Sequence, residues 1–157
     1  MEFTIVYSAH VNDVGPELLS KAEQDLLKAD GAQLEYGPPV GFVVKFTNGL
    51  VAYLSSDTAV FGDMKTVISD FHKASLAVIN LGPNPGMFQS GAYAINDLLK
   101  PASVIFTHVN EAATEGGKLK ANTRTGALMK ELKTPAYLAI SERTMQFDGS
   151  GKCVSGC

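Results

Sequence analysis

Residues 50–58 of the chain read LVAYLSSDT, and this stretch decides the fold. Five apolar residues end abruptly in two serines and a carboxylate, Asp57, and an amphipathic segment follows. Such a run is typical of a buried strand whose C-terminal end delivers a polar side chain into a crevice, where open α/β sheets bind their ligands. We therefore expect Asp57 at the carboxyl edge of a sheet.

Two further strand-like runs each lead into a histidine. Residues 3–9 run into His10, and residues 103–107 run into His108. Imidazole nitrogens and a carboxylate oxygen are ligands that suit zinc, iron or manganese. We therefore predict a metal site formed by His10, Asp57 and His108. The alternative for each histidine alone is an ordinary polar residue at a strand end, whose ring nitrogens find partners nearby.

Length and composition predict one globular domain. The chain has 157 residues, of which 45% are apolar and 18% charged, and its formal net charge is −3. This charge gives no reason to expect nucleic acid or an anionic membrane as a partner. The sequence has no apolar run of the roughly 18 residues that a membrane span needs, and residues 1–4 show no secretory signal. The cellular compartment stays open.

Strand-like and helix-like patterns alternate along the chain, which predicts an α/β fold with a mixed sheet covered by helices. Helical spacing of apolar residues marks residues 17–29, 60–71, 87–99 and 125–132. Strand patterns mark residues 40–46, 50–54, 75–81, 103–107, 135–140 and 144–147. Asn48-Gly49 between the first two of these strands predicts a hairpin with a type I′ turn.

The cysteines, Cys153 and Cys157, lie at the C-terminus among Gly and Ser. Two ligands cannot complete a structural zinc site. Exposed thiols on a flexible tail of residues 149–157 are the simpler interpretation, and a disulfide closing a small loop is the alternative.

Several segments resemble those of metallo-β-lactamase-fold hydrolases, in the branch that contains ascorbate phosphate lactonases. Residues 54–64, LSSDTAVFGDM, resemble that branch's GDTGLFGDM stretch, and residues 80–87, NLGPNPGM, are similar to its PIGGxxxM loop. Residues 98–108, LLKPASVIFTH, resemble its LKPKxVIPxH, and residues 7–10 are similar to its short strand ending in His. The match covers nearly the whole chain but only the second half of that fold, which assigns residues 1–148 to the C-terminal half of an αβ/βα sandwich.

The resemblance implies a role for each predicted ligand. His10 corresponds to the lone His of the first metal site, Asp57 to the carboxylate that bridges two metals, and His108 to the His of the second site. The family's His-x-His-x-Asp-His motif is absent, since the only other histidine is His72, and Ser56 stands where the family has Gly. We therefore expect weakly held metal, zinc first with manganese or iron as alternatives, and no catalytic residue can be assigned.

Two functions follow from these features. The first is metal-dependent hydrolysis of an ester, lactone or phosphoester of a small molecule by metal-activated water, with the chain inactive alone. The second is a non-catalytic α/β association module that keeps relic ligands. Half of such a sandwich leaves one sheet face bare, so the expected partner is a second copy or a chain carrying the missing N-terminal half.

Overall fold

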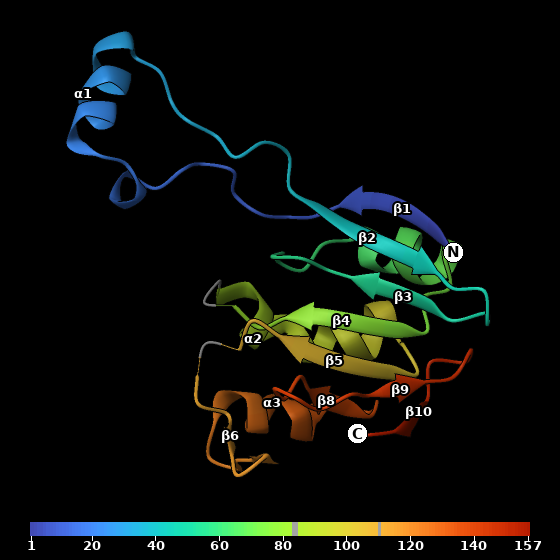
Figure 1. Cartoon of the computed structure of the whole chain (residues 1–157). Coiled ribbons are helices and arrows are strands. Elements are labelled where there is room, and N and C mark those ends of the chain that lie inside the picture. The colour runs from blue at the N-terminus through green and yellow to red at the C-terminus, as the bar shows by residue number, and fades with distance from the viewer. Residues whose placement is uncertain (83–84, 110) are drawn as a thin grey trace.

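The computed structural model describes residues 1–82, 85–109 and 111–157, and it confirms the α/β prediction. Its centre is a six-stranded mixed sheet in the order β1-β2-β3-β4-β5-β8 (Figure 1). The first three strands are antiparallel, and β3, β4, β5 and β8 are parallel. The strands are β1 Glu2–Tyr7, β2 Val40–Lys45, β3 Val51–Leu54, β4 Leu76–Asn80, β5 Ser103–Thr107 and β8 Ala136–Leu138.

The hairpin between β2 and β3 forms as predicted, but with another turn. Among the loop residues 47–49, only Gly49 has a positive φ, of 94°. The Gly49 amide donates to the Phe46 carbonyl. The Phe46 amide in turn donates to the Leu50 carbonyl. This is a three-residue loop in which a left-handed glycine follows an ordinary turn, so the predicted type I′ turn is wrong.

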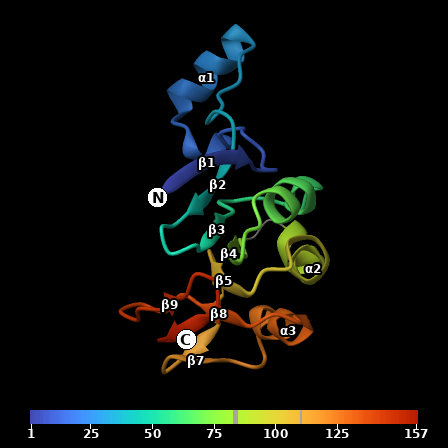
Figure 2. The ribbon, with the colours of Figure 1, turned by 90° about the vertical axis from the view of Figure 1, so that its right-hand side faces the viewer.

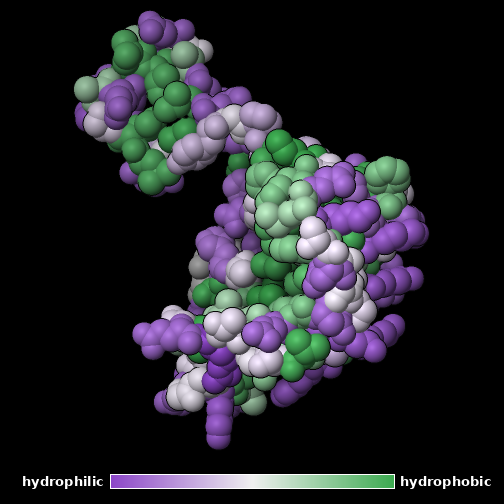
Figure 3. Space-filling view, turned by 45° about the vertical axis from the view of Figure 1, so that its right-hand side comes forward, coloured by the Kyte–Doolittle hydropathy of each residue, from purple (hydrophilic) through white to green (hydrophobic). Residues whose placement is uncertain are grey.

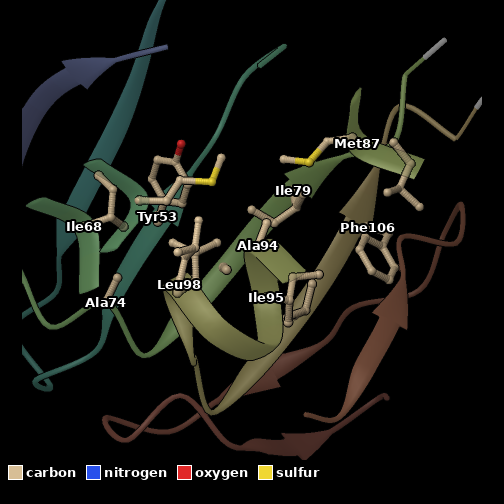
Figure 4. Packing of buried hydrophobic residues seen from close by; sticks show 14 of the residues in the cluster. Tyr53, Ile68, Ala74, Ile79, Met87, Ala94, Ile95, Leu98 and Phe106 are labelled. Carbon is tan, nitrogen blue, oxygen red and sulfur yellow. The ribbon is translucent and has the colours of Figure 1, made fainter. Parts of the chain in front are cut away.

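Helices cover one face of the sheet, as Figure 2 shows. They are the π-helical η2 Met64–Phe71, α2 Pro85–Tyr93, which continues into the π-helical η3 Ala94–Leu99, and α3 Arg124–Glu131. Their apolar stripes pack on the strand residues that point to this side, and Figure 4 shows this layer. The largest fully buried side chains of the core include Tyr53, Phe106, Met64, Ile68, Ile79 and Ile95.

The opposite face, which we call the open face, carries no helices (Figure 2). Phe3 and Ile5 on β1 are 61% and 67% exposed. The register of the strands places these open-face apolar side chains on one surface: Phe3, Ile5, Tyr7, Phe42, Leu54, Val78, Ile105 and Tyr137. One face is thus buried under helices, and the other carries no helix and is exposed at Phe3 and Ile5 of β1.

The chain between β1 and β2, residues 11–39, forms an arm that projects beyond the sheet (Figure 1). The sequence predicts a helix over residues 17–29, but the arm contains a short 3₁₀ turn, η1 Pro16–Leu18, and then α1 Lys21–Asp30. Ser20 and Glu23 form a capping box that starts α1 at Lys21. None of the residues of α1 is buried, so its apolar stripe does not contribute to the core.

The C-terminal segment differs from the predicted flexible tail. Residues Cys153–Ser155 form β10, which pairs with β9 Gln146–Phe147. Cys153 and Cys157 form a disulfide, so the expected free thiols are not present. Their Cα atoms are 6.4 Å apart, a separation that a disulfide spans. This hairpin covers the lower end of the open face, where Phe147 packs beside Tyr137.

A second small hairpin lies in the segment between β5 and α3. It consists of β6 Thr114–Glu115 and β7 Lys118–Leu119, joined by Gly116-Gly117 with positive φ at both glycines. Across the described parts of the chain, no helix has the length and apolar character needed to cross a membrane.

Candidate metal-binding site

The candidate site lies at the carboxyl edge of the parallel strands. β3, β4 and β5 run in the same direction, so the segments that follow them meet at one edge of the sheet. Asp57 follows β3 and His108 follows β5 directly. The sequence prediction that these two side chains belong to strand ends at one edge agrees with this topology.

Asp57 and His108 are brought into contact. The Nδ1 atom of His108 lies 3.3 Å from Oδ1 of Asp57, and the two side chains are 45% and 49% exposed. The pair is therefore open to solvent and to a ligand. An exposed pair of this kind contributes at most about 1 kcal/mol to stability, so the fold does not depend on it.

Gly82 makes room for the His108 ring. A Cβ atom on Gly82 would lie 2.5 Å from Nδ1 and 2.9 Å from Cε1 of His108, closer than carbon atoms tolerate. Gly82 has no positive φ, so its backbone alone does not demand glycine. The lack of a side chain at position 82 is thus what lets the imidazole lie beside Asp57.

Two residues of the site have left-handed backbone conformations. His108 has φ of +50° and Ser56 has φ of +52°. Such conformations cost a residue other than glycine about 1–2 kcal/mol, and they concentrate at functional sites. The family resemblance places a glycine at position 56, and the structure gives the physical reason, because Ser56 keeps the conformation that glycine adopts freely.

Buried hydroxyls tie the Asp57 loop to β1. The Ser8 hydroxyl is fully buried and donates to the Asp57 carbonyl at 2.8 Å. The Ala9 amide donates to Oγ1 of Thr58 at 2.9 Å, and the Ala59 amide donates to the Ala9 carbonyl at 2.8 Å. These bonds fix the backbone on both sides of Asp57.

A second buried pair joins the ends of β3 and β4. The backbone amide of Asn80 donates to the Ser55 hydroxyl at 3.1 Å, and the backbone amide of Ser55 donates to the Val78 carbonyl at 3.0 Å. Ser55 and Asn80 are both buried. Buried polar side chains with satisfied hydrogen bonds hold one geometry, so the edge that carries Asp57 is rigid.

The segment after His108 is anchored to α3 by Glu111. Its carboxylate accepts hydrogen bonds from the Thr125 hydroxyl and amide, both at 2.6 Å, and from the Arg124 amide at 3.2 Å. Burial acts to raise the pKa of Glu111, but these hydrogen bonds outweigh it and hold the pKa below its usual value. The carboxylate thus ties Glu111 to the N-terminus of α3.

His10 follows β1, as the sequence predicts. Its side chain does not group with those of Asp57 and His108. Its Nδ1 donates to the Val11 carbonyl at 2.6 Å, and its side chain is exposed. Over residues 1–82, 85–109 and 111–157, no group of three or more His, Cys, Asp or Glu side chains could hold a metal ion.

The donor chemistry of the pair fits a divalent cation, whereas its number of donors does not complete a site. One carboxylate and one imidazole are ligands of the types that zinc, manganese and iron accept. Two donors fall short of the three or four protein ligands that a zinc site uses. Asp57 and His108 alone thus offer fewer donors than a complete zinc site needs.

Sequence reasoning missed the residues that support this pair. Gly82, Ser8, Ser55 and Asn80 have no signature of their own, because their roles depend on which strand ends meet. One signal was available: the glycine that the resemblance places at position 56 indicates a left-handed turn before Asp57.

Comparisons with known proteins find sequence similarity to curated metal-dependent hydrolases. A UPF0173 metal-dependent hydrolase of Pelotomaculum thermopropionicum is 41% identical over 78 residues, which are 49% of this chain and 33% of that protein. One from Cupriavidus taiwanensis is 30% identical over 103 residues, which are 60% of this chain and 36% of that protein. The chain thus spans about a third of the length of these curated relatives. No protein-family model matches it.

Two solved structures share the fold. Igni18, a metallo hydrolase from the hyperthermophilic archaeon Ignicoccus hospitalis, superposes with a TM-score of 0.50 at 18% identity, over 97% of this chain and 51% of that chain. A protein assigned as a metal-dependent hydrolase from Parabacteroides distasonis superposes with a TM-score of 0.53 at 16% identity, over 87% of this chain and 49% of that chain. The predicted resemblance to metallo-β-lactamase-fold hydrolases is confirmed, and the partial coverage agrees with a match to one half of their fold.

Proposed function

We propose that this chain contributes Asp57 and His108 to the metal site of a metal-dependent hydrolase. The observation that carries the proposal is the 3.3 Å contact between these two metal-capable side chains at the carboxyl edge of the sheet. It occurs in a chain similar in sequence to metal-dependent hydrolases and similar in fold to metallo-hydrolases. The remaining ligands come from a second segment or chain that packs on the open face.

Each residue of the site has a distinct part in this proposal. The Asp57 carboxylate and the His108 imidazole bind a divalent cation, zinc first and manganese or iron as alternatives. Gly82 lets the imidazole reach it, and the buried Ser8 hydroxyl holds the Asp57 backbone. When bound, the metal would supply an activated water for attack on an ester, lactone or phosphoester of a small molecule.

One chain alone holds metal weakly and turns over little substrate under this proposal, because it offers two donors. The rival function is an α/β association module in which Asp57 and His108 are relics. The exposed apolar side chains of the open face support this second candidate, because they offer a surface for association. Metal binding decides between the two.

The test is a calorimetric titration of the metal-free protein with zinc and with manganese, in the wild type and in Asp57→Asn and His108→Ala. Asp97→Asn serves as the control, because Asp97 is an exposed carboxylate on η3. We expect both site variants to bind metal at least about tenfold more weakly, with the control unchanged. Equal affinity in all four proteins would contradict the proposed metal site and leave the association module.

A further inference from the structure

A half-open cavity lies beside β8, the last strand in the order of the sheet. The hairpin of β6 and β7, the helix α3 and the segment after β8 supply its other walls, at the lower end of the body in Figure 1. Its volume is about 150 Å³, and six of its lining side chains are large and mainly apolar: Leu119, Met129, Tyr137, Leu138, Ile140 and Met145. Among the described residues, neither Asp57 nor His108 lines this cavity, so it is separate from the candidate metal site.

One cationic side chain, Arg143, lines the cavity. Its Nη2 atom lies 3.3 Å from the point that a Cβ on Gly117 would occupy, so the glycine turn between β6 and β7 leaves room for the guanidinium. Within the described part of the chain, neither Glu115 of this hairpin nor the adjacent Glu142 forms an ion pair with Arg143. The N–H donors of the guanidinium are therefore available to a ligand.

Two hydroxyl groups add to the polar part of the lining. Thr114 and Tyr137 both line the cavity, and neither hydroxyl has a hydrogen-bond partner among the described residues. Figure 3 shows hydrophilic and hydrophobic residues side by side on the surface of this lower end of the body. A mainly apolar cavity with a few polar groups that fix orientation is the usual form of a small-molecule site.

The walls of the cavity are held in place without a ligand. The Arg143 amide donates to the Ile140 carbonyl at 3.2 Å, which fixes the turn that carries the guanidinium. Gly156 and Cys157 also line the cavity, and the disulfide between Cys153 and Cys157 ties this segment to β10. A site that is already ordered loses less conformational entropy when its ligand binds.

We propose that this cavity binds a small aromatic monocarboxylate, with the ring among the apolar side chains and the carboxylate on Arg143. An apolar cavity of about 150 Å³ takes up a molecule the size of benzene. A guanidinium binds a carboxylate through two parallel N–H···O hydrogen bonds, and one arginine matches the single negative charge of that group. Met129 and Met145 favour a ring, because thioether sulfur makes favourable contacts with ring edges. This site does not depend on the proposed metal site.

The experiment is an NMR titration of the full chain with benzoate, in the presence of a chelator so that no metal is bound. We expect one benzoate per chain, with shifts of backbone amide signals concentrated in residues 114–119 and 136–145. Benzamide has the same ring and a similar shape but no charge, and it should bind at least about tenfold more weakly. Acetate has the charge but no ring, and it should also bind at least about tenfold more weakly.

Arg143→Gln removes the cation without removing a contact on which the fold depends. We expect this variant to keep the wild-type Tm, to bind benzoate at least about tenfold more weakly and to bind benzamide as the wild type does. Lys133→Gln is the matched control, because Lys133 is an exposed cation outside the lining of the cavity. It should keep the wild-type affinity for benzoate.

The wild type alone can overturn the proposal, whatever the behaviour of the variants. Equal affinity for benzoate and benzamide would show that the cation takes no part in binding. The absence of any shift at millimolar benzoate, or shifts centred on Asp57 and His108, would show that the cavity is not the site. None of these results bears on the proposed metal site, which the metal titration of Asp57→Asn and His108→Ala tests separately.

Discussion

Replacing Gly82 with Ala should separate metal binding from stability. The new methyl group would lie 2.5 Å from Nδ1 of His108, so the ring must rotate away from Asp57. The imidazole is the end of an exposed side chain and can move at little cost. The change thus removes the contact between the His108 and Asp57 side chains without replacing either residue.

The expected magnitudes differ for the two properties. Loss of an exposed polar contact changes the free energy of unfolding by less than about 1 kcal/mol, which shifts Tm by less than about 4 °C in a domain of this size. Displacing a residue that orients a metal ligand costs about tenfold to a hundredfold in metal affinity. We therefore expect a nearly unchanged Tm and at least about tenfold weaker binding of zinc or manganese.

Gly62→Ala is the matched control. A Cβ at Gly62 would meet no atom within 4 Å, and Gly62, like Gly82, has no positive φ. Both variants carry the same effect of glycine replacement on the unfolded chain. Calorimetric titration measures the metal affinity of both variants, and thermal unfolding measures their Tm. Wild-type metal affinity in Gly82→Ala would refute the geometry of the pair.

Three further predictions concern stability. Ser56→Gly should raise the free energy of unfolding by about 1 kcal/mol, because glycine relieves the left-handed conformation at φ of +52°; a lower Tm would contradict this. Tyr53→Phe should leave stability equal or raise it by about 1 kcal/mol in urea unfolding, because within the described structure the buried hydroxyl has no hydrogen-bond partner and burial raises its pKa. A clear loss would show that the hydroxyl has a partner. The pKa of Glu111 is lower in the folded chain than its value of about 4.3 in the unfolded chain. The ionised carboxylate therefore stabilises the folded state above that pH, and this stabilisation is lost as the pH falls through the folded pKa. Urea unfolding between pH 5 and pH 3 should therefore be less pH-dependent in Glu111→Gln, and an identical slope in both proteins would speak against this contribution.

The sequence predicted the parts of the fold that local pattern determines. Periodicity and strand propensity located the sheet strands and the helices that cover them, and the ends of β3 and β5 placed Asp57 and His108 at one edge. The structure then brought these two side chains together at 3.3 Å. This contact depends on the parallel pairing of β3, β4 and β5, which alternating strands and helices favour.

Features that depend on side-chain packing were not predicted. The ring of His10 is at the expected strand end, but its Nδ1 donates to the Val11 carbonyl, and no sequence pattern specifies that rotamer. The apolar stripe of residues 17–29 correctly predicted a helix but did not show that this helix, α1, would lie outside the core. The start of that helix was readable, since Ser20 and Glu23 have the spacing of a capping box.

The position of the arm also affects how this chain can change over time. Tyr7 and Val40 are paired neighbours in the sheet, although the arm of residues 11–39 lies between them. The Val14 amide donates to the Leu34 carbonyl and the Tyr36 amide donates to the Asn12 carbonyl, so the two ends of the arm are joined near the sheet. Lengthening or shortening a closed loop changes its entropic cost slowly, by about 0.6 kcal/mol for each doubling. The arm is thus a site where evolution or an engineer can insert, exchange or remove sequence while the sheet and its Asp57–His108 edge are inherited intact.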